Sequence, residues 1–125
     1  MKEEERLQQA ISDYIRFQYP SVIFFCDYAA GLHLPIHIAK RAKRLRSHRG
    51  LPDIFIAQPK ENIHGLFIEF KKQRIKLFKK NGQYATPHIA EQAEMMKKLS
   101  EKNYAVSFAC GFDEAKKIID GYLST

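Results

Sequence analysis

Two acids and a lysine lie on two short segments that are typical of neighbouring strands. Residues 53–57 and 66–71 are rich in strand-forming residues, and the residues between them are typical of a polar turn. Side chains alternate between the faces of a strand, so Glu69 and Lys71 share one face. An antiparallel hairpin places Asp53 opposite Glu69 or Lys71, within about two residues of register. The sequence therefore predicts two carboxylates and a lysine in one patch of an apolar sheet.

Carboxylates held this close repel each other unless a cation lies between them. Mg²⁺ suits such a pair because it binds one or two protein carboxylates and completes its octahedron with waters and phosphate oxygens. It activates water and stabilises charge on phosphate, and a nearby lysine assists both. The set therefore suits the hydrolysis of phosphodiester bonds. The alternative is an ordinary exposed hairpin whose residues form cross-strand ion pairs.

The residues around this pair resemble a known motif. Gly50-Leu51-Pro52-Asp53, followed by Gly65-Leu66-Phe67-Ile68-Glu69-Phe70-Lys71, resembles the PD-(D/E)XK nuclease signature. The whole chain, from its glutamate-rich start to its closing strand and helix, resembles the VRR-NUC family, the virus-type replication-repair nuclease domain. This resemblance implies a restriction-endonuclease-like mixed β-sheet flanked by helices, and an endonuclease that uses Mg²⁺ or Mn²⁺.

The family places a metal-binding glutamate on its first helix. Among Glu3, Glu4 and Glu5, only Glu4 lies three residues before Leu7 and seven before Ile11, so it shares their inward face. The resemblance therefore implies Glu4 as a metal ligand, with Glu5 as the alternate. The other interpretation of Glu4 is an acid at a helix start that the helix dipole stabilises.

The resemblance also assigns roles to the remaining site residues. Asp53 and Glu69 carry over as the main metal ligands, together with the Phe70 carbonyl, and Lys71 as the catalytic lysine. Gln92 matches the glutamine that the family carries on its next helix, and joins the catalytic set. Gln92 also lies on an apolar helical stripe, so a core amide with a satisfied hydrogen bond is the alternative.

The resemblance further implies a substrate and an assembly. Small stand-alone members of the family resemble four-way-junction resolvases, homodimers whose paired sites nick two strands of branched DNA. The chain departs from the family at 28–31, where relatives often carry an asparagine or glutamate before the glycine. The alternatives are a nuclease of the same chemistry that acts on duplex or flap DNA, and a DNA-binding module without catalysis.

Basic residues are concentrated on both sides of the acid pair. Twelve of the 21 lysines and arginines fall within 40–49 and 71–80. Such stretches bind phosphates, although a solvated charged face is the alternative. Phe78 and Tyr84 fit base stacking less well than core or loop packing. The predicted DNA contacts are Lys40, Arg41, Lys43, Arg44, Arg46, Arg49, Lys72, Arg74 and Lys76.

Hydrophobic periodicity predicts an α/β or α+β domain built on one mixed sheet, with the order roughly α-β-(α)-β-β-α-β-α. The first helix begins at Glu3 and ends before Pro20, and Thr86 and Pro87 begin another that ends near Asn103. The other predicted elements are a strand over 21–27, a loop and then a helix within 28–50, a strand over 104–110 and a last helix capped by Asp113.

Composition fits this interpretation. The 125 residues favour one domain, 1–125, and the net charge of +7 favours a polyanionic partner such as nucleic acid, or an anionic membrane surface. Two cysteines exclude a disulfide scaffold. With neither a signal peptide nor a membrane-spanning run, we expect a cytoplasmic protein, of a bacterium or a phage-infected host, without a membrane partner.

Overall fold

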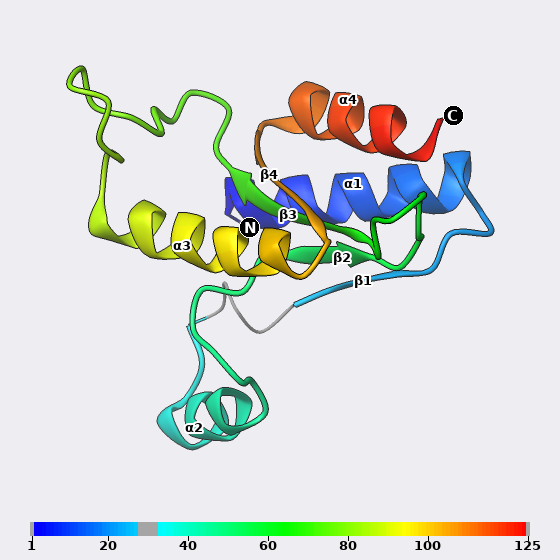
Figure 1. Cartoon of the computed structure of the whole chain (residues 1–125). Helices are drawn as coiled ribbons and strands as arrows, with labels where there is room; N and C mark the ends of the chain where they lie inside the picture. Colours follow the sequence, from blue (N-terminus) through cyan, green and yellow to red (C-terminus); the bar gives the residue numbers. More distant parts are fainter. Residues whose placement is uncertain (1, 28–32, 125) are drawn as a thin grey trace.

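The computed structural model of the chain describes residues 2–27 and 33–124 (Figure 1). Its elements follow the predicted order, and the helix expected within 28–50 is present. The elements are α1 (Glu3–Gln18), β1 (Phe24–Cys26), α2 (Ile36–Arg44), β2 (Ile54–Ile56), β3 (Leu66–Lys71), α3 (Pro87–Glu101), β4 (Ala105–Cys110) and α4 (Phe112–Leu123). Within the described residues, none of the helices has the length and apolar character needed to cross a membrane.

The four strands form one mixed sheet in the order β1-β2-β3-β4. β2 is antiparallel to both β1 and β3, whereas β3 and β4 are parallel. A short turn joins β2 to β3, but a parallel pair requires a crossover, which α3 provides. The predicted α+β class and mixed sheet are therefore confirmed.

The main hydrophobic core lies between the sheet and the two helices α1 and α4, whereas α3 lies on the other side of the sheet (Figure 1). Strand alternation directs Ile68 and Phe70 into this core, and both are at most 1% exposed. Consequently Glu69 and Lys71 face the side of α3. The core is completed by Leu7, Ile11, Ile15, Ile54, Ile56, Leu66, Ala109, Ala115 and Ile119.

The first strand is shorter than predicted. The expected strand over 21–27 is reduced to the three residues of β1. The main chain still pairs beyond both ends of β1, because Ala57 N–H donates to the Ile23 carbonyl at 2.8 Å and Asp27 N–H donates to the Asp53 carbonyl at 2.9 Å. β1 therefore fixes the segment that enters the site, although little of it is regular strand.

The start of α4 also differs from the prediction. Its N-cap is Gly111, not Asp113, which lies in the first turn. Gly111 has a φ of 88°, a conformation that favours glycine, and a Cβ there would lie 3.0 Å from Gln73 Cγ. Glu114 then accepts a hydrogen bond from Cys110 N–H at 3.0 Å. Backbone geometry, rather than an aspartate cap, thus sets this helix start.

Helix α3 begins as predicted. The Thr86 hydroxyl oxygen accepts a hydrogen bond from Ile89 N–H at 3.1 Å, and Pro87 occupies the first helical turn. The helix buries Ile89, Gln92, Met95 and Met96. One polar residue is therefore carried on the buried face of the crossover helix.

Core packing is tested by matched substitutions. Ile68 is 0% exposed in β3, whereas Ile36 is 71% exposed at the start of α2. We expect Ile68→Ala to lower the free energy of unfolding by about 2–5 kcal/mol, because it leaves a cavity in the core. Ile36→Ala should change it by less than about 0.5 kcal/mol. Urea titrations measure both, and equal losses would contradict this description of the core.

Candidate active site

The pairing of β2 with β3 brings Asp53 and Glu69 together. Ile54 pairs with Ile68, so the same register places Asp53, one residue earlier, opposite Glu69. Phe70 N–H donates to Asp53 Oδ2 at 2.8 Å. Asp53 and Glu69 therefore lie side by side at the end of the β2–β3 hairpin, as predicted.

Burial makes this pair electrostatically unfavourable when both groups are charged. Glu69 is 5% exposed, and desolvation together with the Asp53 charge raises its pKa to about 9. Desolvation also raises the pKa of Asp53, opposed by the hydrogen bonds from Glu69 and Phe70 N–H. The protein alone therefore holds a proton between the two carboxyl groups at neutral pH.

Lys71 lies two residues after Glu69 on the same face of β3 and is only 6% exposed. Its positive charge lowers the pKa of both Asp53 and Glu69, so it lies close enough to compensate part of their charge. Its strand is fixed beside β4, and Gly111 N–H donates to the Lys71 carbonyl at 3.1 Å. The structure thus gathers all three residues of the predicted motif.

A wide cleft of about 1120 Å³ opens over these residues. Asp53, Glu69 and Lys71 line it, together with the N-terminal end of α1, part of α2 and the first half of α3. The turn before Asp53 passes along the cleft through Gly50, whose φ of 73° favours glycine. Gly50 therefore permits the turn that leads the chain to Asp53.

The start of α1 contributes an acid to the cleft. Glu4 lines the cleft, and its charge raises the pKa of Glu69, whereas Glu5 does not contribute to the lining. Glu3 also lines the cleft and accepts a hydrogen bond from Gln73 N–H at 3.2 Å, which fixes the start of α1 beside the chain that leaves β3. The geometry favours Glu4 over Glu5 as the acid that faces the pair.

Gln92 reaches the cleft from α3. It is 6% exposed, and its Oε1 is buried with no hydrogen-bond partner among the described residues. A buried acceptor left without a partner costs about 1–3 kcal/mol. The buried oxygen of Gln92 therefore suits a donor in the cleft better than it suits the alternative of a satisfied core amide.

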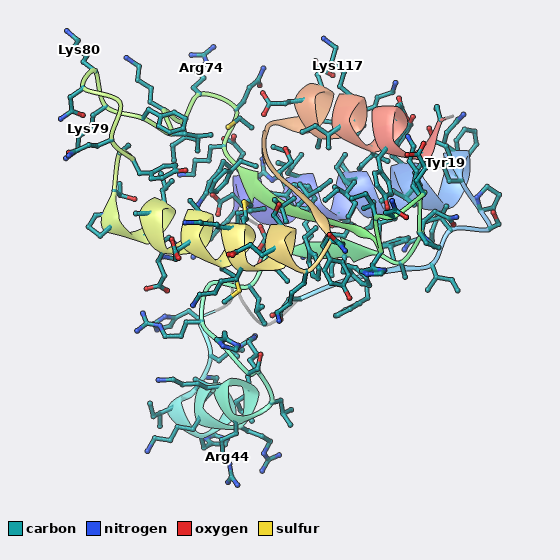
Figure 2. The ribbon with its side chains drawn as sticks, viewed as in Figure 1. Tyr19, Arg44, Arg74, Lys79, Lys80 and Lys117 are labelled. Carbon is teal, nitrogen blue, oxygen red and sulfur yellow. The ribbon has the colours of Figure 1, made fainter. Side chains whose placement is uncertain are left out.

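The structure places some of the predicted DNA contacts at the cleft and others away from it. Lys43, Arg46, Arg49 and Lys72 line the cleft, and Arg74 lines a smaller hollow beside it. The cleft lining does not include Lys40, Arg41, Arg44 and Lys76, which are exposed. Arg44 points away from the main body at the far side of α2, and Arg74 points outward from the segment after β3 (Figure 2).

Asp27 is a cleft residue that the sequence analysis missed. Its carboxylate accepts hydrogen bonds from Arg46 Nε at 2.8 Å and Nη2 at 3.0 Å, and its charge raises the pKa of Asp53. The pair holds the segment after α2 against the end of β1. Arg46 is therefore a positioning residue as well as a predicted DNA contact. The only signal in the sequence was an acid directly after an apolar strand.

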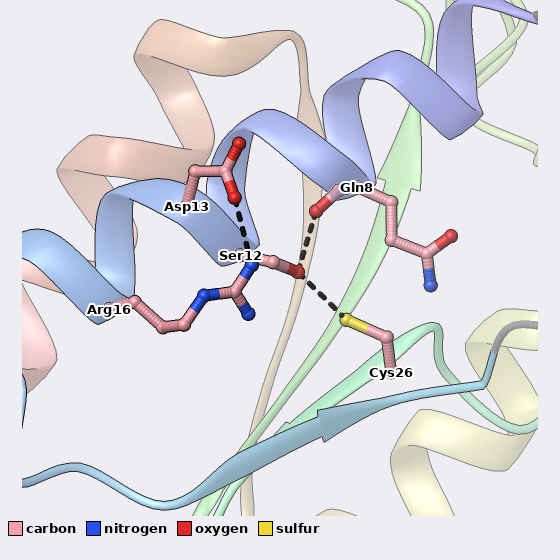
Figure 3. Close-up of polar contacts among 5 residues, drawn as sticks. All are labelled: Gln8, Ser12, Asp13, Arg16 and Cys26. Atoms are coloured by element: carbon pink, nitrogen blue, oxygen red, sulfur yellow. Dashed lines mark hydrogen bonds and ion pairs between the residues drawn. The ribbon is translucent and has the colours of Figure 1, made fainter.

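Helix α1 supports the site from its middle turns. Gln8 Nε2 donates to the Asp53 carbonyl at 3.5 Å. One turn later the Ser12 hydroxyl donates to the Gln8 carbonyl at 2.8 Å and lies 3.3 Å from Cys26 Sγ, as Figure 3 shows. These contacts fasten α1 to β1 next to Asp53. No sequence pattern indicated the contacts of Gln8 with Asp53 and of Ser12 with Cys26, because they join residues distant in the chain.

The donor set fits a hard divalent cation. The Asp53 and Glu69 carboxylates are adjacent, and the Phe70 carbonyl lies on the same side of β3 as its N–H, which faces Asp53. Among the described residues there is no group of three or more acids, histidines or cysteines placed to hold a metal ion. Mg²⁺ does not require one, because it binds one or two carboxylates and keeps several waters. The loop at 28–31 lies outside the described residues.

Glu69→Gln tests the buried pair. A carboxyl group whose pKa rises on folding stabilises the fold below its unfolded pKa, and this contribution is lost as the pH rises through the folded pKa, about 9 here. In chelator, we therefore expect the unfolding free energy of the unmodified chain to fall relative to Glu69→Gln between acidic pH and pH 9. Urea titrations measure it, with exposed Glu94→Gln as the control. Parallel pH curves for the unmodified chain and Glu69→Gln would contradict the assignment.

Comparisons with known proteins support the resemblance to the VRR-NUC family. No protein-family model matches the sequence, and no curated protein matches it. Among solved structures the chain is similar to a VRR_NUC domain protein, with a TM-score of 0.64 and 25% identity, over 98% of this chain and 89% of that chain. This likeness supports the VRR-NUC family and agrees with the restriction-endonuclease-like fold that the motifs predict.

Proposed function

We propose that this chain is an Mg²⁺- or Mn²⁺-dependent endonuclease that hydrolyses phosphodiester bonds in DNA. The likeness to a VRR_NUC domain protein supports a nuclease domain in general. The observation that carries the finer proposal is the buried pair of Asp53 and Glu69, with Lys71 beside it, in a cleft with basic walls. A buried pair of acids is costly unless a cation compensates it, and basic walls suit a polyanion.

In this proposal Asp53 and Glu69 hold the cation with the Phe70 carbonyl, and Glu4 adds a carboxylate from the start of α1. All of these donors are oxygens, which favours a hard cation over zinc or copper. The chemistry supplied by such a cation is the activation of water and the stabilisation of charge on phosphate. The proton shared by Asp53 and Glu69 leaves when the cation is held, so binding strengthens as the pH rises.

Lys71 and Gln92 then act on the nucleophile and the phosphate. The ammonium group of Lys71 donates hydrogen bonds to the attacking water or to a phosphate oxygen as negative charge develops there. The buried Oε1 of Gln92 accepts a hydrogen bond from the water and so orients it. The Lys43, Arg49 and Lys72 side chains contact flanking phosphates and set the register of DNA in the cleft.

A cleavage assay tests the catalytic assignment. We expect nicking of DNA with Mg²⁺ or Mn²⁺, none in chelator, and a rate lower by about 10²- to 10³-fold in Lys71→Ala, because a group that stabilises developing charge is removed. Lys71→Met retains most of the side-chain volume and should lose the same activity. Lys98→Ala, in the last turn of α3, is the control.

Three outcomes separate the proposal from its alternatives. Cleavage that persists in chelator would contradict metal dependence, and full activity in both Lys71 variants would contradict the role of that lysine. Salt-sensitive DNA binding without cutting in either metal would identify a binding module instead of an enzyme.

We further propose that the substrate is branched DNA and that the chain acts as a homodimer. The resemblance to small stand-alone VRR-NUC proteins supports this proposal. So does the outer edge of β1, an edge strand flanked by apolar side chains, because Ile23 is 73% and Phe25 is 66% exposed. A second copy paired there covers the edge and supplies a second site for the opposite strand.

Substrate preference and assembly are measured together. We expect paired symmetric nicks on a synthetic four-way junction, little cutting of linear duplex of the same sequence, and a mass by light scattering of twice 14.6 kDa. Phe25→Asp should give the monomer mass and unpaired nicks, whereas Leu45→Asp, at a position 83% exposed beside α2, should not. Equal cutting of linear duplex would exclude the junction preference and leave the catalytic assignment intact.

A further inference from the structure

A small hairpin projects from the main body between β3 and α3. In residues 77–85, here called the 77–85 hairpin, Lys79 N–H donates to the Gln83 carbonyl at 2.7 Å and Ala85 N–H donates to the Leu77 carbonyl at 2.8 Å. Gly82, with a φ of 87°, permits the tight turn between its two sides. In Figure 1 this segment extends away from the sheet beyond the start of α3.

The hairpin carries an exposed pair of stacked aromatic rings. Phe78 and Tyr84 face each other across it, with ring centroids 5.0 Å apart and planes at 29°. Phe78 is 53% and Tyr84 is 39% exposed. Rings this open to solvent are not explained by burial in a core. The expectation of core packing is therefore wrong for these residues, whereas loop packing is confirmed, because the two rings pack on each other within the 77–85 hairpin.

The stretch of sequence that carries this pair contains basic and neutral residues only. No aspartate or glutamate occurs between Glu69 and Glu91, whereas that stretch contains six lysines and arginines. The ion pairs found within the described part of the chain include none of the six. Lys79 and Lys80 lie at the tip of the hairpin, and Arg74 projects from the segment that leads to it (Figure 2). Apart from Lys71, which compensates the buried acids, these residues are therefore available to an external polyanion.

Both ends of the hairpin connect to the active-site cleft. Lys72 and Ile75 line the cleft before the hairpin, and Thr86 and His88 line it afterwards. A nucleic acid strand that leaves the cleft on this side therefore passes the exposed rings. Flat aromatic faces combined with unpaired cations favour single-stranded DNA, whose bases stack on aromatic side chains while its phosphates contact lysines.

We propose that the 77–85 hairpin binds unpaired bases beside the scissile phosphate, so that the enzyme selects DNA with an opened or single-stranded segment next to duplex. An aromatic ring stacks only on a base whose face is free, and the bases of continuous duplex already stack on their neighbours. Phe78 and Tyr84 contact the bases, and Lys79 and Lys80 contact the flanking phosphates. The inference rests on the proposed nuclease function, because it assumes that DNA occupies the cleft.

Binding in chelator, where cutting does not occur, tests the hairpin apart from catalysis. The probes are a duplex with a short single-stranded gap that carries 2-aminopurine and the matching continuous duplex. Stacking on an aromatic side chain is worth about 1–3 kcal/mol per base, so we expect Phe78→Ala and Tyr84→Ala each to weaken gapped-DNA binding by about 10-fold. Both should leave duplex binding within about twofold of the unmodified chain and abolish 2-aminopurine quenching.

Conservative and charge variants separate stacking from hairpin folding and from phosphate binding. Tyr84→Phe keeps the ring and should retain gapped-DNA binding, whereas Phe78→Leu keeps an apolar side chain without a ring and should lose it. Replacing Lys79 and Lys80 by alanine should weaken both DNAs and lower the slope of affinity against salt by about two. Circular dichroism verifies that each variant remains folded.

The result that overturns this inference differs from the one that overturns the nuclease function. Metal-dependent cutting together with unchanged gapped-DNA binding in Phe78→Ala and Tyr84→Ala would refute the stacking role and retain the nuclease. Equal weakening of gapped and duplex DNA would assign the rings to hairpin folding and would also refute it. An unmodified chain that neither binds nor cuts DNA would refute both proposals.

Discussion

The burial of Asp53 against Glu69 is the constraint on which the rest of the site depends. Two carboxyl groups taken out of water at the end of a hairpin cannot both be charged without compensation. The main chain contributes Phe70 N–H, and β3 itself contributes Lys71 two residues later. What remains uncompensated is held as a shared proton, which a divalent cation is suited to replace. The local fold thus creates one site that attracts positive charge.

The topology of the sheet decides what surrounds this point. The parallel partner β4 requires a crossover, and that crossover is α3, which brings Gln92 to the cleft. The core between α1 and the sheet fixes the helix so that its first turn, with Glu4, borders the same cleft. A glutamine and an acid distant in the chain are therefore delivered by elements whose main role is packing. Their alignment follows from the core rather than from local sequence.

Helix α2 and the 77–85 hairpin lie outside the hydrophobic core. Helix α2 contains no buried residue, and the Asp27–Arg46 ion pair anchors the segment that follows it beside the site. The 77–85 hairpin extends from the body, and a few main-chain hydrogen bonds join its two sides. Helix α2 carries lysine and arginine and contributes Lys43 to the cleft, whereas the hairpin carries Lys79 and Lys80 and lies between cleft residues Ile75 and Thr86. The packed part of the fold thus holds the acid pair, and these outer parts carry basic side chains that the proposed function assigns to DNA.

The sequence by itself determined the strands that carry the motif, because alternation along 66–71 fixes the shared face of Glu69 and Lys71, and the polar turn before it limits the register to within about two residues. It likewise determined the start of α3, where Thr86 and Pro87 act locally. Only the tertiary structure decided that β1 is short, that Gly111 rather than Asp113 begins α4, and that Phe78 and Tyr84 are exposed. It also decided that Asp27 holds Arg46 and that the buried Oε1 of Gln92 has no hydrogen-bond partner among the described residues. These features depend on contacts between residues distant in the chain, which neither periodicity nor local capping preference encodes.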